Sequence, residues 1–153
     1  MQIDPQQLAE GMLQAVPFVR TLGLELLEVS PDGLQAVVRL PDSAATHNHV
    51  GGPHAGAMFT LGETASGAVV LAALGDLLDR AVPLTVRADV AYHRLAMGPV
   101  RATARLGRPP GEVAAELAGG ARPEIPVVVE IGTEDGTVTA TMTVTWTLRS
   151  NIV

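Results

Sequence analysis

The chain of 153 residues contains no cysteine and no lysine, and its only aromatic side chains are Phe18, Phe59, Tyr92 and Trp146. The missing cysteine excludes thiol nucleophiles, disulfides, zinc–thiolate sites and iron–sulfur ligation. The missing lysine excludes Schiff-base chemistry, pyridoxal phosphate anchoring and a lysine-containing phosphate loop. Any catalysis must therefore use carboxylates, hydroxyls, imidazoles or backbone groups.

Positive charge is also scarce, because 10 arginines face 16 acidic side chains and the formal net charge is −6. A nucleic-acid partner needs a dense basic patch to neutralise phosphates, so the composition favours a small-molecule partner instead. The N-terminus carries Asp4 and Glu10 and lacks a basic start with a continuous apolar stretch, so a cytoplasmic protein is the default expectation. The longest stretch of small and apolar residues, 64–75, falls far short of the roughly 20 residues that cross a bilayer, and no membrane partner is expected.

The N-terminal segment predicts helix. Residues 4–21 place apolar side chains at helical spacing, with Asp4 suited to capping and Pro5 to the first turn. Pro17 interrupts this pattern. We expect an N-terminal helical segment over about 4–21, ahead of a core that spans about 22–149 of a single domain, 1–153.

A hairpin and a long helix follow. Residues 24–29 and 34–40 predict two strands around a tight turn at 30–33, whose Pro and Gly fit a reversal. Residues 54–79 predict a helix rich in Ala, Gly and Val. Its glycines lower the intrinsic helix propensity, so packing must hold it, and we expect a central helix wrapped by a sheet.

The second half of the chain predicts β-structure with one short helical insertion. The expected elements are strands at 84–93 and 100–106, the insertion at 111–118, and a hairpin of 125–131 and 138–148 around 134–136. This order predicts an α+β fold, with a mostly antiparallel sheet packed on one face by the long helix.

Alternation assigns the faces of two of these strands. In 84–93, the apolar set of Leu84, Val86, Ala88, Val90 and Tyr92 is expected to share one face, with Thr85 on the other. In the last strand, threonines occupy every odd position from 137 to 147. We expect this threonine face to meet solvent rather than a second dimer.

Charge is almost absent from residues 43–75, where Glu63 is the one formally charged side chain. Its neighbours on the same helical face are small or weakly polar, as in the wall of a cleft. Partial desolvation disfavours the charged form of a carboxyl group and can prepare it to act as a base. The alternative is that Glu63 lies at a helix position that reaches solvent.

The segment immediately before the helix contains three histidines and three glycines between His47 and Gly56. Glycines permit close approach of the backbone, and the free N–H groups of a first helical turn form a site for an oxyanion. We expect His47 and His49 to be simply exposed. No spacing matches a zinc helix motif and no G-x-S-x-G elbow is present, so neither a metal, another cofactor nor a serine nucleophile is predicted.

Residues 48–63, from the loop into the long helix, match a motif of a known protein family. The chain resembles hotdog-fold thioesterases of the PaaI-like superfamily, and more closely a bacterial branch known as a domain of unknown function. The matching pattern is N-x-x-G-x-x-H-G-G with a following L-x-D or L-x-E, here Asn48, Gly51, His54, Ala55, Gly56, Leu61 and Glu63. Element order and the final strand agree over residues 17–149.

The resemblance implies a hotdog fold, a curved sheet around the long helix, in a homodimer with active sites at the interface, often paired into a tetramer. It implies that Glu63 attacks an acyl-CoA or acyl carrier protein thioester or activates water. The N–H of Ala55 would bind the oxyanion, with Asn48 and His54 positioning the carbonyl or the water. Thr85 aligns with a hydroxyl that orients water in some members.

The remaining candidates concern substrate binding. Gly51, Gly56, Phe59 and Gly67 are expected near the substrate, although Gly67 stands where other members carry a hydroxyl. Arg94 is the first candidate for the phosphates of coenzyme A. The acyl pocket is expected to be shaped by whichever of Met58, Phe59, Met97 and 108–123 line it. Two alternatives stay open: a non-catalytic acyl-binding or scaffold protein, which the Ala55 departure favours, and a dehydratase or hydratase.

Overall fold

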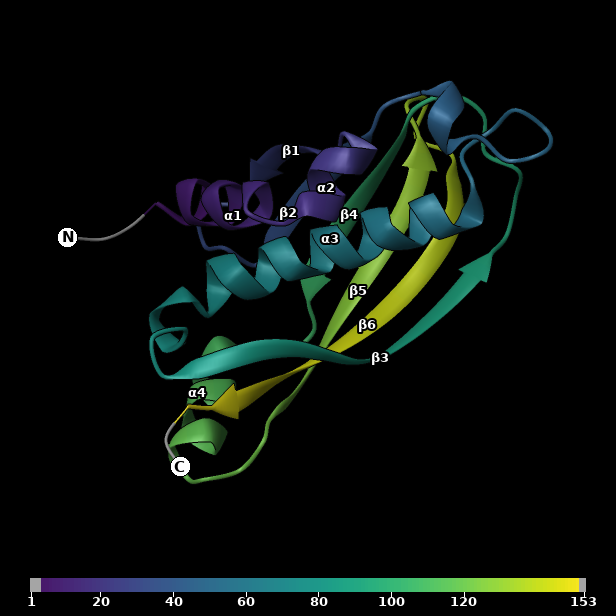
Figure 1. Ribbon diagram of the computed structural model, residues 1–153. Helices are drawn as coiled ribbons and strands as arrows, with labels where there is room; N and C mark the ends of the chain where they lie inside the picture. Colours follow the sequence, from purple (N-terminus) through teal and green to yellow (C-terminus); the bar gives the residue numbers. More distant parts are fainter. Residues whose placement is uncertain (1–3, 152–153) are drawn as a thin grey trace.

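A computed structural model describes residues 4–151 and contains a six-stranded sheet curled around one long helix (Figure 1). The strand order is β1-β2-β4-β5-β6-β3, and each neighbouring pair is antiparallel. The helices are α1 Pro5–Gln14, α2 Pro17–Leu22, α3 Ala55–Ala73 and α4 Pro110–Ala118. The strands are β1 Glu25–Val29, β2 Gln35–Leu40, β3 Ala81–Tyr92, β4 Val100–Leu106, β5 Glu124–Thr133 and β6 Val138–Ser150. The predicted α+β fold class is confirmed.

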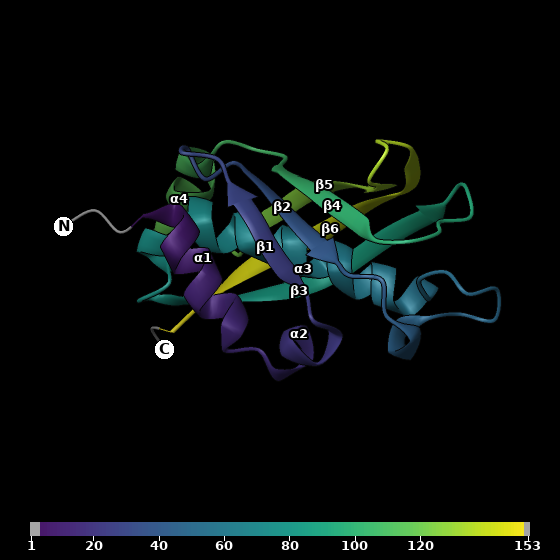
Figure 2. The same ribbon diagram turned by 90° about the horizontal axis from the view of Figure 1, so that it is seen from above.

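The N-terminal helical segment divides at Pro17, as its sequence predicts. The Asp4 carboxylate accepts a hydrogen bond from the Gln6 N–H at 3.1 Å and caps α1. Helix α2 begins at Pro17 and ends at Leu22, and the capping residue Gly23 has a φ of 69°, the left-handed conformation that closes many helices. Helix α1 packs along α3, with α2 beside it at one side of the molecule (Figure 2).

Helix α3 is the centre of the core, but it ends at Ala73, earlier than the predicted 79. A 3-10 turn, Gly75–Leu77, follows, and the buried Leu77 side chain fixes this change of direction. By length and composition alone α3 could cross a membrane, yet most of it is buried inside the fold. The sheet and α1 therefore account for its apolar composition.

A β-bulge in β3 makes one prediction wrong. Strand β6 pairs Trp146 with Thr85 and the next residue, Thr145, with Arg87, so Val86 is the extra residue. The bulge reverses the alternation, and the exposed Leu84 and Val86 do not share a face with the rest of the predicted apolar set. Thr85 instead lies on the inner face, where its hydroxyl reaches α3.

The threonine face of β6 is less exposed than the sequence predicts. Thr145 and Thr147 are buried, with relative exposures of 6% and 4%. Strand β6 has neighbours on both sides, and Thr145 lies in register between Arg87 of β3 and Pro126 of β5. A short side chain between longer ones is shielded from water, which the alternating pattern alone could not indicate.

Candidate active site

Glu63 and Thr85 contact each other where α3 passes the edge strand β3. Glu63 lies midway along α3, and Thr85 lies on β3 at the bulge. The Thr85 hydroxyl donates a hydrogen bond to Glu63 Oε1 at 3.2 Å. Helix and strand therefore hold a carboxylate and a hydroxyl together, although the residues are 22 positions apart in the sequence.

A cavity of about 240 Å³ opens beside Glu63. One wall is the face of α3 that runs from Glu63 to Leu71, and a second is formed by Pro83 and Trp146. Apolar side chains of the N-terminal helices close the remaining side: Met12, Leu13, Val16 and Val19. The half-buried carboxylate thus borders an apolar space.

The Trp146 ring packs closely against Gly67. A Cβ on Gly67 would come within 3.3 Å of Trp146 Cζ2, closer than side chains normally pack. The indole Nε1–H donates to Ser66 Oγ at 2.9 Å, and Ser66 Oγ donates to the Glu63 backbone carbonyl at 2.6 Å. Trp146 therefore fixes the wall of the cavity and the helical turn that carries Glu63.

Burial raises the pKa of Glu63 above its ordinary value of 4.5, and the hydrogen bond from Thr85 partly opposes this rise. The folded protein therefore holds a proton on Glu63 at pH values where the unfolded chain has released it. As pH rises from 4.5 through this raised pKa, Glu63 makes the fold progressively less stable.

Replacement of Glu63 should accordingly stabilise the protein at neutral pH. Glu63→Gln removes the buried charge and keeps an oxygen that accepts from Thr85. We expect its melting temperature to exceed that of the wild type at pH 7, with the difference shrinking as pH falls toward 4.5. Thermal unfolding over a pH series measures this, and an equal or lower melting temperature at pH 7 would contradict the desolvation of Glu63.

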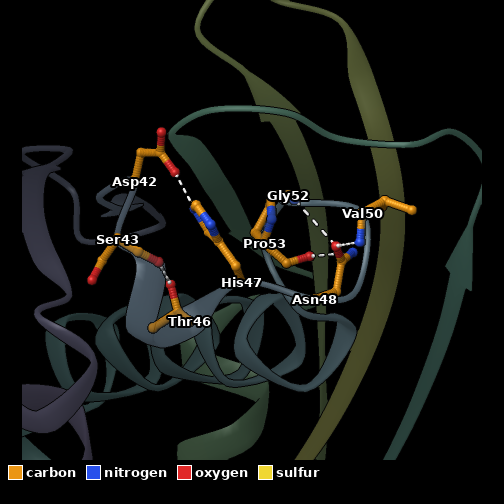
Figure 3. Close-up of polar contacts among 8 residues, drawn as sticks. All are labelled: Asp42, Ser43, Thr46, His47, Asn48, Val50, Gly52 and Pro53. Atoms are coloured by element: carbon orange, nitrogen blue, oxygen red, sulfur yellow. Dashed lines mark hydrogen bonds and ion pairs between the residues drawn. The ribbon is translucent and has the colours of Figure 1, made fainter.

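The loop before α3 is organised by its own side chains (Figure 3). Asn48 Oδ1 accepts hydrogen bonds from the N–H groups of Val50 at 3.0 Å and Gly52 at 3.1 Å, and its amide donates to the Pro53 carbonyl at 3.4 Å. Both polar atoms of Asn48 are thus engaged within the loop. The predicted contact of Asn48 with substrate stays a prediction. In the structure, its side chain stabilises the loop through these three hydrogen bonds.

Two neighbours of Asn48 are constrained as well. Gly51 has a φ of 81°, which favours glycine, and a Cβ on Gly52 would lie 2.3 Å from the Ala96 carbonyl oxygen. His47 is only partly exposed, and its ring contacts Asp42 at 2.6 Å. The sequence predicts that His47 and His49 are exposed. His49 is exposed, and His47 is partly exposed because its ring lies against Asp42.

The N-terminus of α3 presents backbone donors. The His54 ring accepts a hydrogen bond from the Gly56 N–H through Nδ1 at 2.8 Å and so caps the helix. Among residues 4–151, no group accepts a hydrogen bond from the Ala55 N–H. The Ala55 carbonyl accepts from the Tyr92 hydroxyl at 2.8 Å, which ties the end of β3 to this helical turn.

The structure does not bring all predicted site residues together. Gly67 lines the cavity beside Glu63, whereas His54 and Gly56 line a separate cavity of about 360 Å³ under α2. Ala55 precedes Glu63 by eight residues on α3, which corresponds to about 12 Å along the helix axis. Within one chain, the Ala55 N–H and the Glu63 carboxylate therefore cannot both contact the same thioester carbonyl.

The other candidates lie outside both cavities. Phe59 is half-buried against the core, and none of the predicted pocket-forming residues lines the Glu63 cavity. Arg94 is exposed and forms no ion pair within the described part of the chain. Arg108, by contrast, pairs with Glu116. In the same part of the chain, no cluster of three acidic or histidine side chains could hold a metal ion.

Sequence comparison assigns the chain to a family. The family model described as domain of unknown function, DUF4442, matches residues 5–148. No curated protein matches the chain.

Solved structures share its fold. PA5026 of Pseudomonas aeruginosa, described as a protein of unknown function and probable thioesterase, superposes with a TM-score of 0.81 at 28% identity, covering 95% of each chain. A thioesterase family protein from Silicibacter pomeroyi gives 0.77 at 20% identity, covering 96% of this chain and 99% of its own. The PaaI protein of the Escherichia coli phenylacetic acid degradation operon gives 0.74 at 16%, covering 94% and 92%. The chain therefore belongs to the DUF4442 family and has the hotdog fold of the PaaI-like thioesterases.

Proposed function

We propose that this protein is an acyl-CoA thioesterase that uses Glu63 as its catalytic carboxylate. The observation that carries the proposal is the position of Glu63, a desolvated carboxylate that contacts Thr85 and faces an apolar cavity. The apolar space suits an acyl group, and the carboxylate suits attack at the thioester carbonyl. The thioesterase descriptions of the structural neighbours support the same reaction class.

Hydrolysis requires little machinery beyond this carboxylate. Glu63 takes a proton from water, and the water oxygen adds to the carbonyl carbon. The tetrahedral intermediate then collapses, the carbon–sulfur bond breaks, and the proton passes to the leaving thiolate, giving a carboxylic acid and coenzyme A. Direct attack by Glu63 through an anhydride reaches the same products. A thiolate is a good leaving group, so a base and oriented oxyanion donors suffice.

The oxyanion donor in this proposal comes from a second copy of the chain. The Ala55 N–H is free but lies about 12 Å along α3 from Glu63. An antiparallel dimer would bring the N-terminus of one α3 toward the Glu63 of the other. Strand β3 offers the contact, because it is a sheet edge of 12 residues that exposes most of its side chains.

In the same proposal, Thr85 orients the attacking water and keeps Glu63 ionised. A hydroxyl that donates to a carboxylate stabilises the charged form, so loss of this bond raises the pKa of Glu63 further. We expect Thr85→Val to move the acidic limb of the kcat/KM profile to higher pH, while Thr85→Ser leaves it in place. An unchanged profile in Thr85→Val would remove Thr85 from the mechanism.

The direct test is an assay of the purified protein against an acyl-CoA panel, with free thiol as the readout. Release of thiol from at least one acyl-CoA supports the enzyme. Saturable binding without thiol release across the panel would instead identify an acyl-CoA-binding protein. Arg94 remains the proposed contact for the phosphates of coenzyme A, since it is an exposed arginine with no ion pair among the described residues.

A further inference from the structure

The cavity beside Glu63 has a polar end and an apolar end. Among its lining residues, the carboxylate and hydroxyl belong to the neighbours Glu63 and Thr64. The α3 wall then continues through Gly67 and Val70 to Leu71, about 12 Å further along the helix axis. A molecule with one reactive polar end and an apolar tail fits this arrangement.

The far wall of the cavity is supplied by α1 and α2. Leu13 and Val19 are buried there, while Met12 and Val16 are 45% and 44% exposed and lie at the rim. The indole nitrogen of Trp146 already donates to Ser66, so it is not free to bind a polar substituent on a ligand. A hydroxylated or charged tail would therefore lose its hydration without a replacement partner.

We propose that this cavity is a selective acyl pocket for medium-length aliphatic chains, and that the α1–α2 helix pair sets the chain length. The inference rests on the proposed thioesterase function and specifies its substrate. The cavity of about 240 Å³ holds about eight groups the size of a methylene, taking about 30 Å³ for each, the volume of a water molecule. Short acyl groups leave the space partly empty, and carbons that extend past the rim at Met12 and Val16 gain no further burial.

Two measurements test the pocket. Hydrolysis of straight-chain acyl-CoA esters from acetyl to palmitoyl should increase about fourfold in kcat/KM per methylene up to about eight carbons, then stop increasing. Binding can be followed without turnover, because Trp146 is the only tryptophan of the chain and lies on the cavity wall. Titration with S-alkyl-CoA thioethers, which cannot be hydrolysed, should change its fluorescence with the same dependence on chain length.

Val16 can be replaced by a larger or a smaller residue, because it is partly exposed at the junction of α1 and α2. Val16→Phe should shift the preferred chain to fewer carbons, and Val16→Ala should shift it to more. Val128→Phe and Val128→Ala are matched controls at a similarly exposed valine on β5, outside this cavity, and should leave the preference unchanged. Circular dichroism shows whether each variant folds, and the alanine variant carries the test if the phenylalanine variant does not.

The outcomes separate the pocket from the reaction. Thioether binding with the expected length dependence, but no thiol release, supports the pocket and overturns the proposed thioesterase. Hydrolysis that is indifferent to chain length, and to both Val16 variants, overturns the pocket and leaves the thioesterase standing. Absence of both binding and length-dependent hydrolysis also overturns the pocket.

Discussion

Glu63→Gln should lower the rate of acyl-CoA hydrolysis by about two to four orders of magnitude. The substitution keeps the size of the side chain and its contact with Thr85 but removes the base that takes the proton from water. Because chemistry is lost and the cavity is kept, the decrease should appear in kcat rather than in substrate binding. Steady-state kinetics on the best substrate of the panel measures both.

A matched control separates this effect from a general change of charge. Glu130→Gln makes the same chemical change at an exposed position of β5 and should retain wild-type activity. If Glu63→Gln is more stable than the wild type at pH 7, as expected, its loss of activity is not caused by unfolding. Full activity in Glu63→Gln would show that Glu63 is not the catalytic carboxylate.

Ala55→Pro should lower kcat by about 10²–10³-fold through loss of a single backbone N–H. Ala55 is the first residue of α3, where proline is tolerated because that N–H makes no bond within the helix. His54, which precedes it, has a φ of −63° and a ψ of 142°, the extended conformation that a following proline requires. The variant therefore removes a donor at the proposed oxyanion site and keeps the helix.

Ala55→Gly is the control for this experiment, because it retains the N–H and changes only the methyl group. Its activity should stay close to the wild type, and it also tests whether the methyl group narrows the approach of the acyl chain. Circular dichroism and thermal unfolding should be nearly unchanged in both variants. Wild-type activity in a folded Ala55→Pro protein would show that the Ala55 N–H is not the oxyanion donor.

The sequence predicts much of this site because the signal for Glu63 is local. A single carboxylate in the charge-poor segment 43–75, on a helix that begins after a glycine-rich loop, indicates its position and its desolvation. The two helices at the N-terminus, the hairpins and the insertion are likewise signalled by their own prolines, glycines and alternation.

Contacts between distant segments could not be predicted in this way. The bulge that turns Thr85 toward Glu63 adds one residue to an otherwise regular alternation, and nothing in the residues themselves marks Val86 as the extra one. Similarly, Met12 and Val16 form the apolar face of a predicted helix, but the sequence does not say which cavity they close. Alternation places Trp146 on the face of its strand opposite the threonines, but it does not indicate that the ring forms a wall of the cavity.

The most direct test of the account is complementation between the two inactive variants. In a mixture of Glu63→Gln and Ala55→Pro chains that have exchanged subunits, each mixed dimer has one site with both an intact Glu63 and an intact Ala55 N–H. Random pairing of equal amounts should therefore restore about a quarter of the wild-type sites, with a matching return of thiol release. No recovery in a mixture shown to contain mixed dimers would contradict an active site built from Glu63 of one copy and the α3 N-terminus of another.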